Sequence, residues 1–276
     1  MKMDKETQGG SFRDPNGFMF SREGRLYRQV NKRYRKEYDH LIHSGLYDRL
    51  VSDGLLVRHE ESDLSLAISN DAYKILRPSI IPYISYPHEW CFSQLKDAAL
   101  LTLAVQKKAL EHDMSLKDCS AFNVQFNGER AVFIDTLSFE LYREGQPWVA
   151  YRQFCQHFLA PLSLMSYKDV RLNQLFQVYI DGIPLDLASA LLPVRSYLSF
   201  PLVTHLHLHS HYQTKYADET KKPVKRGNVS RTAHLGIIDN LESAIKRLKW
   251  TPRGTEWAEY YEDTNYTGEG LSLIHI

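Results

Sequence analysis

A short predicted hairpin with polar residues at its base is the feature that most constrains the fold of this chain. Asn127-Gly128 separates two apolar runs, residues 124–126 and 131–134. Asn-Gly is the strongest short-range signal for a two-residue hairpin turn. Pairing of the two runs would bring Asn123, which precedes the first, and Asp135, which follows the second, to the same end of the hairpin.

The spacing of these polar residues suggests a chemistry. Asp118 precedes Asn123 with four residues between them, and this order of Asp, Asn and a strand-end Asp is typical of phosphoryl-transfer sites. There the first Asp orients the attacking hydroxyl, and the other two hold Mg²⁺ through oxygen atoms. We therefore take Asp118 as a candidate catalytic residue and Asn123 and Asp135 as candidate metal ligands. The alternative is structural: Asp118 begins a turn, and Asn123 and Asp135 cap the elements that follow them.

Composition and charge limit the expected partners and cellular location of this chain. The chain has 276 residues and a net charge of +1, so no strong field favours nucleic acid as a partner. Its three cysteines are odd in number and widely spaced, which fits reduced thiols in a cytosolic protein. Cys119 is expected to be a packing residue. Residues 1–10 are polar and expected to be disordered, and no stretch is long and apolar enough for a signal peptide or membrane span. The prediction is a cytoplasmic protein.

The first part of the chain reads as strands around one helix. A hairpin is expected over residues 17–30, turning at Ser21-Arg-Glu-Gly24. Apolar residues at helical spacing follow from Tyr34 to Ile42, and Gly45 is placed to end or bend this helix. Further strand-like runs are expected at residues 55–57, 72–76 and 80–84.

The second part reads as mostly helical. Residues 93–112 form a strong predicted helix with Ser93 as its N-cap. Beyond Asp135, Pro147 suits the first turn of a helix towards Phe158, residues 167–180 are apolar at intervals, and Pro184 is placed to open another helix. Asp239 is expected to cap a helix over residues 240–248.

Three later segments carry weaker signals. Residues 205–211 alternate histidine with other residues, and on a helix His205/His209 and His207/His211 would form two pairs that could bind zinc; a packed helix is the favoured interpretation. Residues 221–231 are basic and read as a linker that could touch phosphate. The tail aromatics are expected to pack on a neighbouring surface: Trp250, Trp257, Tyr260 and Tyr261.

The order of elements looks like a protein-kinase or aminoglycoside-phosphotransferase fold. The expected class is α+β and two-lobed, with a small β-rich N-lobe at 11–90 and a helical C-lobe at 91–215 that carries the metal-site hairpin at 118–135. Residues 85–90 would be the hinge. The lobes would be followed by a basic loop or linker at 216–233 and a helical connector at 234–276.

Four longer motifs carry a closer resemblance: Ser11-Phe-Arg-Asp-Pro-Asn-Gly17, Leu26-Tyr-Arg-Gln-Val-Asn31, Ser93-Gln-Leu-Lys-Asp-Ala-Ala-Leu-Leu-Thr-Leu103 and Phe133-Ile-Asp-Thr-Leu-Ser-Phe139. They resemble bacterial class I S-adenosylmethionine-dependent methyltransferases of the nodulation-protein type, over about residues 11 to 267. These proteins carry a kinase-like region ahead of a methyltransferase domain. The resemblance implies a longer, intact methyltransferase that uses S-adenosylmethionine and acts on an unidentified small-molecule or macromolecular acceptor.

The cofactor fold itself is absent from this sequence, which lacks the strand, Gly-rich turn and helix that would bind S-adenosylmethionine. We therefore expect a truncated N-terminal region whose main partner is a missing methyltransferase domain. Residues 271–276 resemble a translated sequencing adapter and are interpreted as artefactual, with a short apolar natural terminus as the alternative.

Several parts of a working kinase are also altered. No His precedes Asp118, Gly17 and Gly24 do not form a G-x-G-x-x-G loop, and Thr136-Leu137 follows Asp135 where a kinase has Phe-Gly. Arg28 or Lys32 would replace the strand lysine, with Glu37 as its helical partner, although Arg and Lys differ in geometry.

These departures leave two hypotheses for the cleft. In the first, it is a pseudokinase-like module that binds substrate, partner or nucleotide, with Arg28, Glu37 and the hinge residue Glu89 as candidate cofactor-binding residues. The alternative is an active small-molecule phosphotransferase that uses ATP and Mg²⁺ with Asp118, Asn123 and Asp135.

Overall fold

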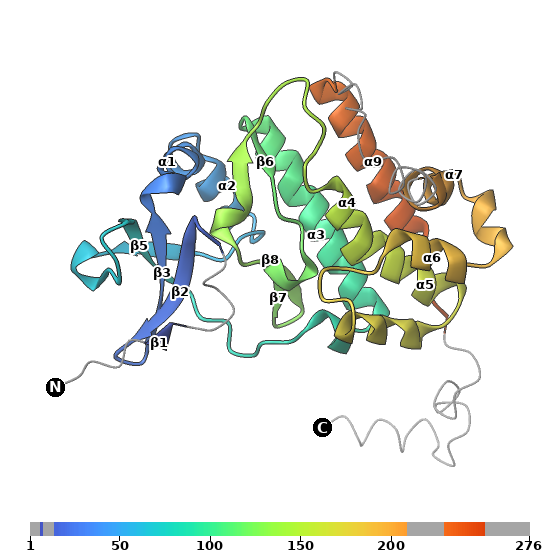
Figure 1. Ribbon diagram of the computed structural model, residues 1–276, viewed down its shortest axis with the longest axis horizontal. Helices are drawn as coiled ribbons and strands as arrows, with labels where there is room; N and C mark the ends of the chain where they lie inside the picture. The colour runs from blue at the N-terminus through green and yellow to red at the C-terminus, as the bar shows by residue number, and fades with distance from the viewer. Residues whose placement is uncertain (1–5, 8–13, 209–228, 252–276) are drawn as a thin grey trace, which may run out of the picture.

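An antiparallel sheet and two short helices form one end of the molecule (Figure 1). The computed structural model describes residues 6–7, 14–208 and 229–251. Within them the main sheet has the strand order β1-β2-β3-β5-β4. Its strands are β1 (Glu6–Thr7), β2 (Gly17–Arg22), β3 (Arg25–Asn31), β4 (His59–Ser62) and β5 (Ala72–Pro78). Helices α1 (Arg35–His43) and α2 (Leu46–Ser52) connect β3 to β4.

The local signals in this lobe explain its turns. Arg22 pairs with Arg25 across the predicted β2–β3 turn, where Glu23 and Gly24 have φ angles of 54° and 73°. Positive φ at both central residues gives the turn whose twist matches paired strands. Gly45, with φ of 79°, separates α1 from α2 as predicted, because a left-handed residue ends a helix with little strain in glycine.

Two strand predictions in this lobe are wrong. Residues 55–57 contribute only a single bridge, between Leu56 and Phe133. Residues 80–84 form no strand, and Ile80 is 65% exposed, which fits the presence of Pro82, a residue without an N–H for pairing. The polar segment of β4 was missed instead, because an edge strand that pairs only with β5 has little apolar alternation to reveal it.

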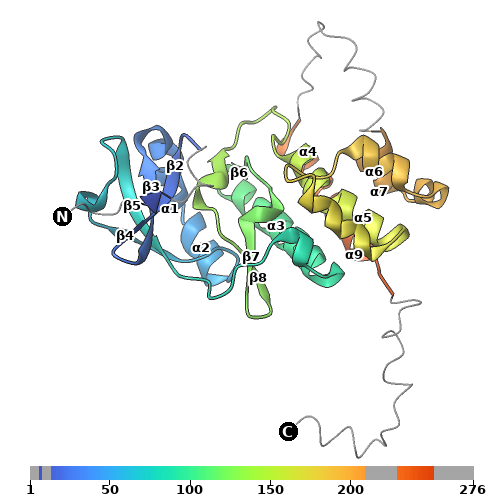
Figure 2. The ribbon, with the colours of Figure 1, turned by 60° about the horizontal axis from the view of Figure 1, so that its bottom comes forward.

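Helices make up most of the other lobe (Figures 1 and 2). Helix α3 (Phe92–Glu111) is largely buried at its centre, and two small antiparallel pairs of strands lie beside it. The pairs are β6 (Met114–Leu116) with β9 (Phe139–Leu141), and β7 (Val124–Asn127) with β8 (Arg130–Phe133). In both views the β7–β8 hairpin lies between the sheet and the outer helices.

The outer helices follow in chain order. They are α4 (Tyr151–Phe154), the π-helical η6 (Cys155–Leu159), α5 (Ala160–Tyr167), the 3₁₀ segment η7 (Val170–Gln177), α6 (Leu185–Leu191), η8 (Val194–Leu198), α7 (Phe200–Leu202), η9 (Val203–His207) and α9 (Arg231–Arg247). The predicted class is therefore confirmed: a two-lobed α+β fold with a small sheet lobe and a helical lobe in the kinase-like order.

Several helix starts differ from the prediction. The N-cap of α3 is Cys91 instead of Ser93, and its amide donates to Gln94 Oε1 at 3.0 Å. The helix expected at Pro147 begins at Tyr151, after Trp148, whose buried indole donates to the Leu116 carbonyl at 2.9 Å.

Helix α9 also begins earlier than predicted. Ser230 caps it by accepting from the Ala233 amide at 3.2 Å. Asp239 is therefore a mid-helix residue, paired with Lys107 at 2.6 Å, and the predicted basic loop gives way to helix at Arg231. The rest of that loop, residues 216–228, lies outside the described residues.

The histidine segment is packed, as favoured. His205 is hydrogen bonded to the Tyr151 hydroxyl at 2.6 Å and to Asn240 Oδ1 at 2.9 Å. His207 lies between the hydroxyls of Ser189 and Ser196 at 2.7 and 2.9 Å. In the described part of the chain no group of three His, Cys, Asp or Glu side chains could hold a metal. His209, His211, Trp257, Tyr260 and Tyr261 lie outside the described residues.

None of the helices described is long and apolar enough to cross a bilayer.

Candidate functional site

The predicted β7–β8 hairpin forms and brings its polar ends together. Val124 pairs with Phe133 and Asn127 with Arg130, with Gly128 in the turn at φ of 63°. At the open end the Ile134 amide donates to the Asn123 carbonyl at 2.8 Å. Asn123 and Asp135 therefore flank one end of the hairpin, as the sequence predicted.

This end of the hairpin opens into a cleft of about 540 Å³ between the lobes. The sheet lobe contributes residues from the start of β2 and from β3, and the helical lobe contributes the segments around the hairpin and one residue of α4. The lining residues are Asp14, Asn16, Gly17, Arg28, Lys117, Asp118, Asn123, Asp135, Leu137, Ser138 and Gln153. The three polar residues of the predicted phosphoryl-transfer pattern thus share one cleft.

Asp135 is held by several donors at once. Arg28 forms an ion pair with its Oδ1, the Ser138 hydroxyl donates to Oδ2, and the Leu137 amide donates to Oδ1 at 3.2 Å. Burial alone would raise the pKa of Asp135, but the charge of Arg28 and these hydrogen bonds outweigh it and lower the pKa below its usual value. The group is therefore a carboxylate whose charge a protein cation already balances.

A magnesium ion, which the kinase-like order implies, does not fit this arrangement as it stands. Both oxygens of Asp135 are engaged, Oδ1 by Arg28 and the Leu137 amide and Oδ2 by the Ser138 hydroxyl. A cation at Asp135 would have to displace the guanidinium of Arg28.

Asp118 is oriented from the helical lobe. Its Oδ1 accepts from the Ser120 amide at 2.9 Å and from Gln153 Nε2 at 2.8 Å, while Gln153 Oε1 accepts from the Cys119 amide at 2.7 Å. The Gln153 side chain thus fixes both Asp118 and the backbone after it. These bonds also fit the structural alternative, in which Asp118 begins a turn.

The two groups beneath this turn are held neutral. Burial, with a smaller effect of Asp118, raises the pKa of the Cys119 thiol well above its usual value, as expected for a packing cysteine. His157 accepts a hydrogen bond from the Ala121 amide at its Nδ1, at 3.3 Å. Burial lowers the pKa of His157 to about 4, although Asp118 acts in the opposite direction.

The expected ion pair of Arg28 or Lys32 with Glu37 is not formed. Arg28 does not pair with Glu37; its guanidinium reaches across the cleft to Asp135 instead. Lys32 is exposed and donates to the Asn70 carbonyl at 2.7 Å. Glu37 is on α1 and does not line the cleft, so of these residues only Arg28 is in the predicted position.

The predicted hinge segment, residues 85–90, is held by contacts that the sequence did not indicate. Gln125 of β7 clamps Ser85, accepting from its amide and donating to its carbonyl, both at 3.0 Å. The Trp90 indole donates to Ser85 Oγ at 2.8 Å. Glu89 does not line the cleft, because its carboxylate accepts from the Tyr86 amide at 2.7 Å and caps η3 (Pro87–Glu89).

Sequence reasoning missed several residues of the cleft. Ser138 had a readable signal, since it follows Asp135 by three residues at the end of a short turn. Gln153 and Lys117 gave none, because their roles depend on tertiary contacts: Lys117 Nζ lies 4.7 Å from the centre of the Tyr34 ring. Asp14 and Asn16 belong to the motif at residues 11–17, but no feature of that motif indicated that they would line the cleft.

The arrangement of the elements gives this chain a two-lobed α+β fold in the kinase-like order. It is 32% identical to the nodulation protein NoeA of Rhizobium meliloti (strain 1021) over 264 residues, which is 94% of this chain and 55% of that protein. The chain thus spans about half the length of this curated relative. No family model matches it. Among solved structures it is similar to vaccinia related kinase 3, with 11% identity, a TM-score of 0.42 and coverage of 90% of this chain and 91% of that one.

Proposed function

We propose that this chain is a kinase-like binding region of a longer protein, and that its cleft holds a polar substrate or partner segment without transferring phosphate. The observation that supports this most is the ion pair between Arg28 and Asp135. In a phosphoryl-transfer site this carboxylate would hold the metal that bridges the phosphates. Here it already has a cation, and its second oxygen accepts from Ser138.

The cleft lining supports a polar ligand. Besides the ion pair it offers carboxylates from Asp14 and Asp118, amides from Asn16 and Asn123, and the Lys117 ammonium. A lining that combines donors and acceptors favours a molecule with several hydroxyl or amide groups over a purely anionic one. The ligand would bind in the position where kinase-like folds bind nucleotide.

For the longer protein we propose an S-adenosylmethionine-dependent methyltransferase of the nodulation-protein type, with this region presenting or recognising the methyl acceptor. Two observations support this proposal: the resemblance of the four motifs, and the fact that this chain covers only 55% of the length of its relative. Sequencing the gene beyond codon 276 is the direct test. A reading frame that continues into anything other than a Gly-rich cofactor-binding fold would remove the methyltransferase part of the proposal.

The binding role is tested by calorimetry on the full chain. ATP is titrated with and without Mg²⁺ into the wild type and into Asp135→Ala. We expect no Mg²⁺-dependent heat in either protein, because Arg28 occupies the carboxylate. Saturable Mg²⁺-dependent binding by the wild type that Asp135→Ala abolishes would contradict the proposal.

A second candidate function has its own support, because Asp118, Asn123 and Asp135 line one cleft and Gln153 orients Asp118. In this alternative the chain is a small-molecule phosphotransferase in which Mg²⁺-ATP displaces Arg28 from Asp135, and Asp118 is the catalytic base. It predicts ATP-dependent phosphorylation of a hydroxyl acceptor, followed by mass spectrometry, that both Asp118→Asn and Asp135→Ala abolish.

A further inference from the structure

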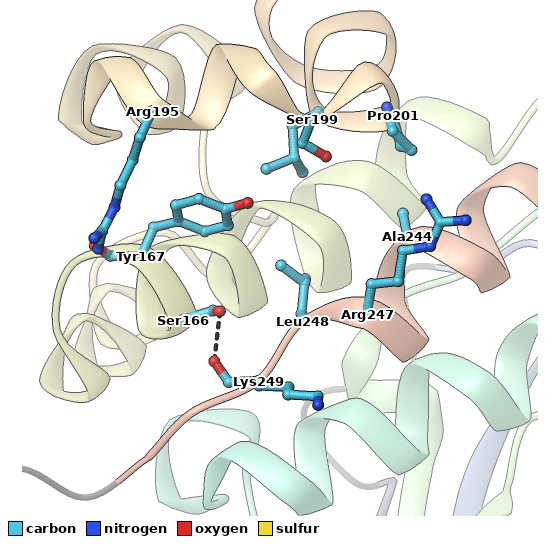
Figure 3. A pocket seen from close by; sticks show the side chains of 10 residues that line it. Ser166, Tyr167, Arg195, Ser199, Pro201, Ala244, Arg247, Leu248 and Lys249 are labelled. Atoms are coloured by element: carbon cyan, nitrogen blue, oxygen red, sulfur yellow. Dashed lines mark hydrogen bonds between the residues drawn. The ribbon is translucent and has the colours of Figure 1, made fainter.

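The helical lobe carries a groove that is separate from the interlobe cleft (Figure 3). It consists of two adjoining hollows, of about 330 and 650 Å³, which share Ser166, Tyr167, Arg195 and Lys249 in their linings. Neither hollow has a lining residue in common with the cleft. The walls come from the end of α5, the start of η7, the segment from η8 to α7, and the end of α9. We call this feature the α5–α9 groove.

The α5–α9 groove is basic, and its charges are spread along it. The exposed cations in its lining are Lys168, Arg171, Arg195, Arg247 and Lys249. The carboxylate of the lining is Asp169, which accepts from Arg171 at 2.9 and 2.6 Å. Figure 3 shows Arg195 and Arg247 on opposite sides of the first hollow. Cations at such separate positions suit a stretch of chain that carries several carboxylates, and they do not suit a single anionic group.

Several of these cations lack a counterion. Arg195 donates to the Tyr167 carbonyl at 2.8 Å, and a carbonyl does not neutralise its charge. Lys168, Arg247 and Lys249 have no hydrogen-bond or ion-pair partner for their side chains among the described residues. Exposed cations of this kind are ordinary on a protein surface and do not define a site by themselves. They become informative through the stretch of chain that follows the groove.

Apolar surface lies among the charges of the groove. The buried Leu248 lines the first hollow, and Trp250, which is 41% exposed, lines the second. Leu198 and Phe200 flank the lining residue Ser199 along the chain and are 90% and 72% exposed. Large apolar side chains that lie this exposed beside one another are typical of a surface that another segment covers.

The chain itself supplies a segment of matching chemistry directly after the groove. The last described residue is Thr251, which lines the second hollow. Residues 255–266, which we call the acidic segment, contain four carboxylates, four aromatic residues and no Lys or Arg. The carboxylates are those of Glu256, Glu259, Glu262 and Asp263, and the aromatic residues are Trp257, Tyr260, Tyr261 and Tyr266. The charge and the aromatic content of this segment thus complement the groove.

The short connection makes a weak interaction sufficient. Three residues, 252–254, separate Thr251 from the acidic segment, and a short linker gives an effective concentration on the order of 1 mM. The start of this connection is also held in place, because the Ser166 hydroxyl donates to the Lys249 carbonyl at 2.6 Å. Exposed ion pairs are each worth little. Several of them, together with contacts of the aromatic rings, are what a tethered segment of this composition provides.

We infer that the acidic segment docks in the α5–α9 groove of the same chain. Its carboxylates pair with the separate cations of the groove, and its aromatic rings cover the apolar side chains among them. Docking fixes the course of the chain beyond α9 against the helical lobe. The inference is independent of the interlobe cleft and of the function proposed for it.

Paramagnetic broadening of amide signals tests this inference on the full chain. A spin label is attached to Ala258→Cys in a Cys91→Ser background, because Cys119 and Cys155 are buried. The label should broaden the amide signal of Ser199 in the groove and leave signals of the sheet lobe unchanged. The broadening at Ser199 should weaken as salt is raised, since salt screens exposed charges.

Charge reversal separates docking from the mere closeness that the connection imposes. The reversed segment carries Glu256→Lys, Glu259→Lys and Glu262→Lys. The reversed groove carries Arg195→Glu, Arg247→Glu and Lys249→Glu, all at exposed positions. The broadening at Ser199 should be lost with either set alone and should return when the two are combined. Glu269→Lys, which changes a carboxylate beyond the acidic segment, is the matched control and should keep the broadening. The amide spectrum also establishes that each variant is folded.

Three results would overturn the inference. The first is a signal of Ser199 that is broadened equally in the wild type and in the reversed segment, or in neither. The second is a combined variant in which the broadening does not return. The third comes from a mixture of spin-labelled chains with isotope-labelled chains that carry no spin label. Broadening at Ser199 in that mixture would place the acidic segment in the groove of a second copy.

Discussion

At the scale of single residues, Arg28 decides how the cleft is to be understood. Arg28, on strand β3, neutralises Asp135, while Ser138 joins Asp135 to Asn123. The two predicted metal ligands, Asn123 and Asp135, thus form a network of protein groups with Ser138 and Arg28. This network lies at the junction of the two lobes, because Arg28 comes from β3 and Asp135 follows β8.

The stability of this junction can be measured with a double-mutant cycle. Both partners are mostly buried, with side-chain exposures of 17% for Arg28 and 16% for Asp135. Arg28→Met should lower the free energy of unfolding by roughly 3 kcal/mol, because it leaves a buried carboxylate unpaired. Asp135→Asn should also destabilise, and the double variant should cost less than the sum by at least about 1 kcal/mol.

Urea unfolding gives these values. Arg33→Met serves as the control, since an exposed arginine should change stability by no more than about 0.5 kcal/mol. Additive effects of the Arg28 and Asp135 substitutions would show that the ion pair is not formed in solution.

His157 makes stability depend on pH. The unfolded chain gains a proton on this histidine as pH falls through about 6.5, whereas the folded protein gains it only near a pKa of about 4. Stability should therefore fall with decreasing pH between these two values, by about 1.4 kcal/mol per pH unit from this group, and the loss should stop below the lower one.

His157→Asn tests this pH dependence. The Asn side chain can still accept from the Ala121 amide, but it does not titrate. Between pH 6.5 and 4 the decrease in unfolding free energy with falling pH should be shallower than in the wild type by up to about 1.4 kcal/mol per unit. His43→Asn, at an exposed position, should keep the wild-type slope. An unchanged slope in His157→Asn would mean that folding does not lower the pKa of this histidine.

At the scale of elements, the β7–β8 hairpin holds the hinge as well as the polar residues at its base. Gln125 satisfies both the amide and the carbonyl of Ser85, and Phe126 packs edge-on against Trp90 with ring centres 5.3 Å apart. The backbone of the hinge at Ser85 is therefore bound to protein. This restricts what a ligand in the cleft could reach there.

Removing the clamp should loosen the hinge. Gln125→Ala leaves the amide and carbonyl of Ser85 without their partner, so amide hydrogen exchange at Ser85 should accelerate and stability should fall by roughly 2 kcal/mol. Gln174→Ala removes an exposed contact to the His88 carbonyl in the same region and should have a smaller effect. Protection at Ser85 that is unchanged in Gln125→Ala would argue against the clamp.

Elements with a strong local signal were predictable from sequence. Asn127-Gly128, Gly24 and Gly45 indicated turns, because glycine readily adopts positive φ angles. Helix α3 was predictable because it is long and rich in helix-forming residues. Beginnings that depend on tertiary contacts were not predictable. Tyr151 starts a helix late because Trp148 is anchored to Leu116, and the polar strand β4 exists only because β5 provides its pairing partner.

The same limit applies to the site. The sequence placed Asp118, Asn123 and Asp135 correctly in one cleft, because a hairpin fixes what lies at its ends. It did not predict that Arg28 would form its ion pair with Asp135 instead of Glu37, because this pairing depends on how the two lobes pack together. The position of Glu89 outside the cleft has a local cause, because its carboxylate accepts from the Tyr86 amide and caps its own turn.

At the scale of the whole molecule, the lobes are joined by more than the hinge. Leu137 of the helical lobe packs in the sheet-lobe core with Val30, Tyr34 and Leu76, and the Tyr34 hydroxyl donates to the Phe139 carbonyl at 2.7 Å. His112 and Ser44 make a further link at 2.9 Å. The cleft is thus built between two lobes in firm contact, which suits a binding site of fixed shape.

The central claim is that Arg28 takes the place of a metal ion on Asp135, and Mn²⁺ binding tests it most directly. Free Mn²⁺ is measured by electron paramagnetic resonance as the full chain is added, for the wild type, for Arg28→Met and for Arg28→Met with Asp135→Asn. The wild type should leave the Mn²⁺ signal unchanged, Arg28→Met should reduce it, and the double variant should restore it. Saturable Mn²⁺ binding by the wild type that depends on Asp135 would contradict the account.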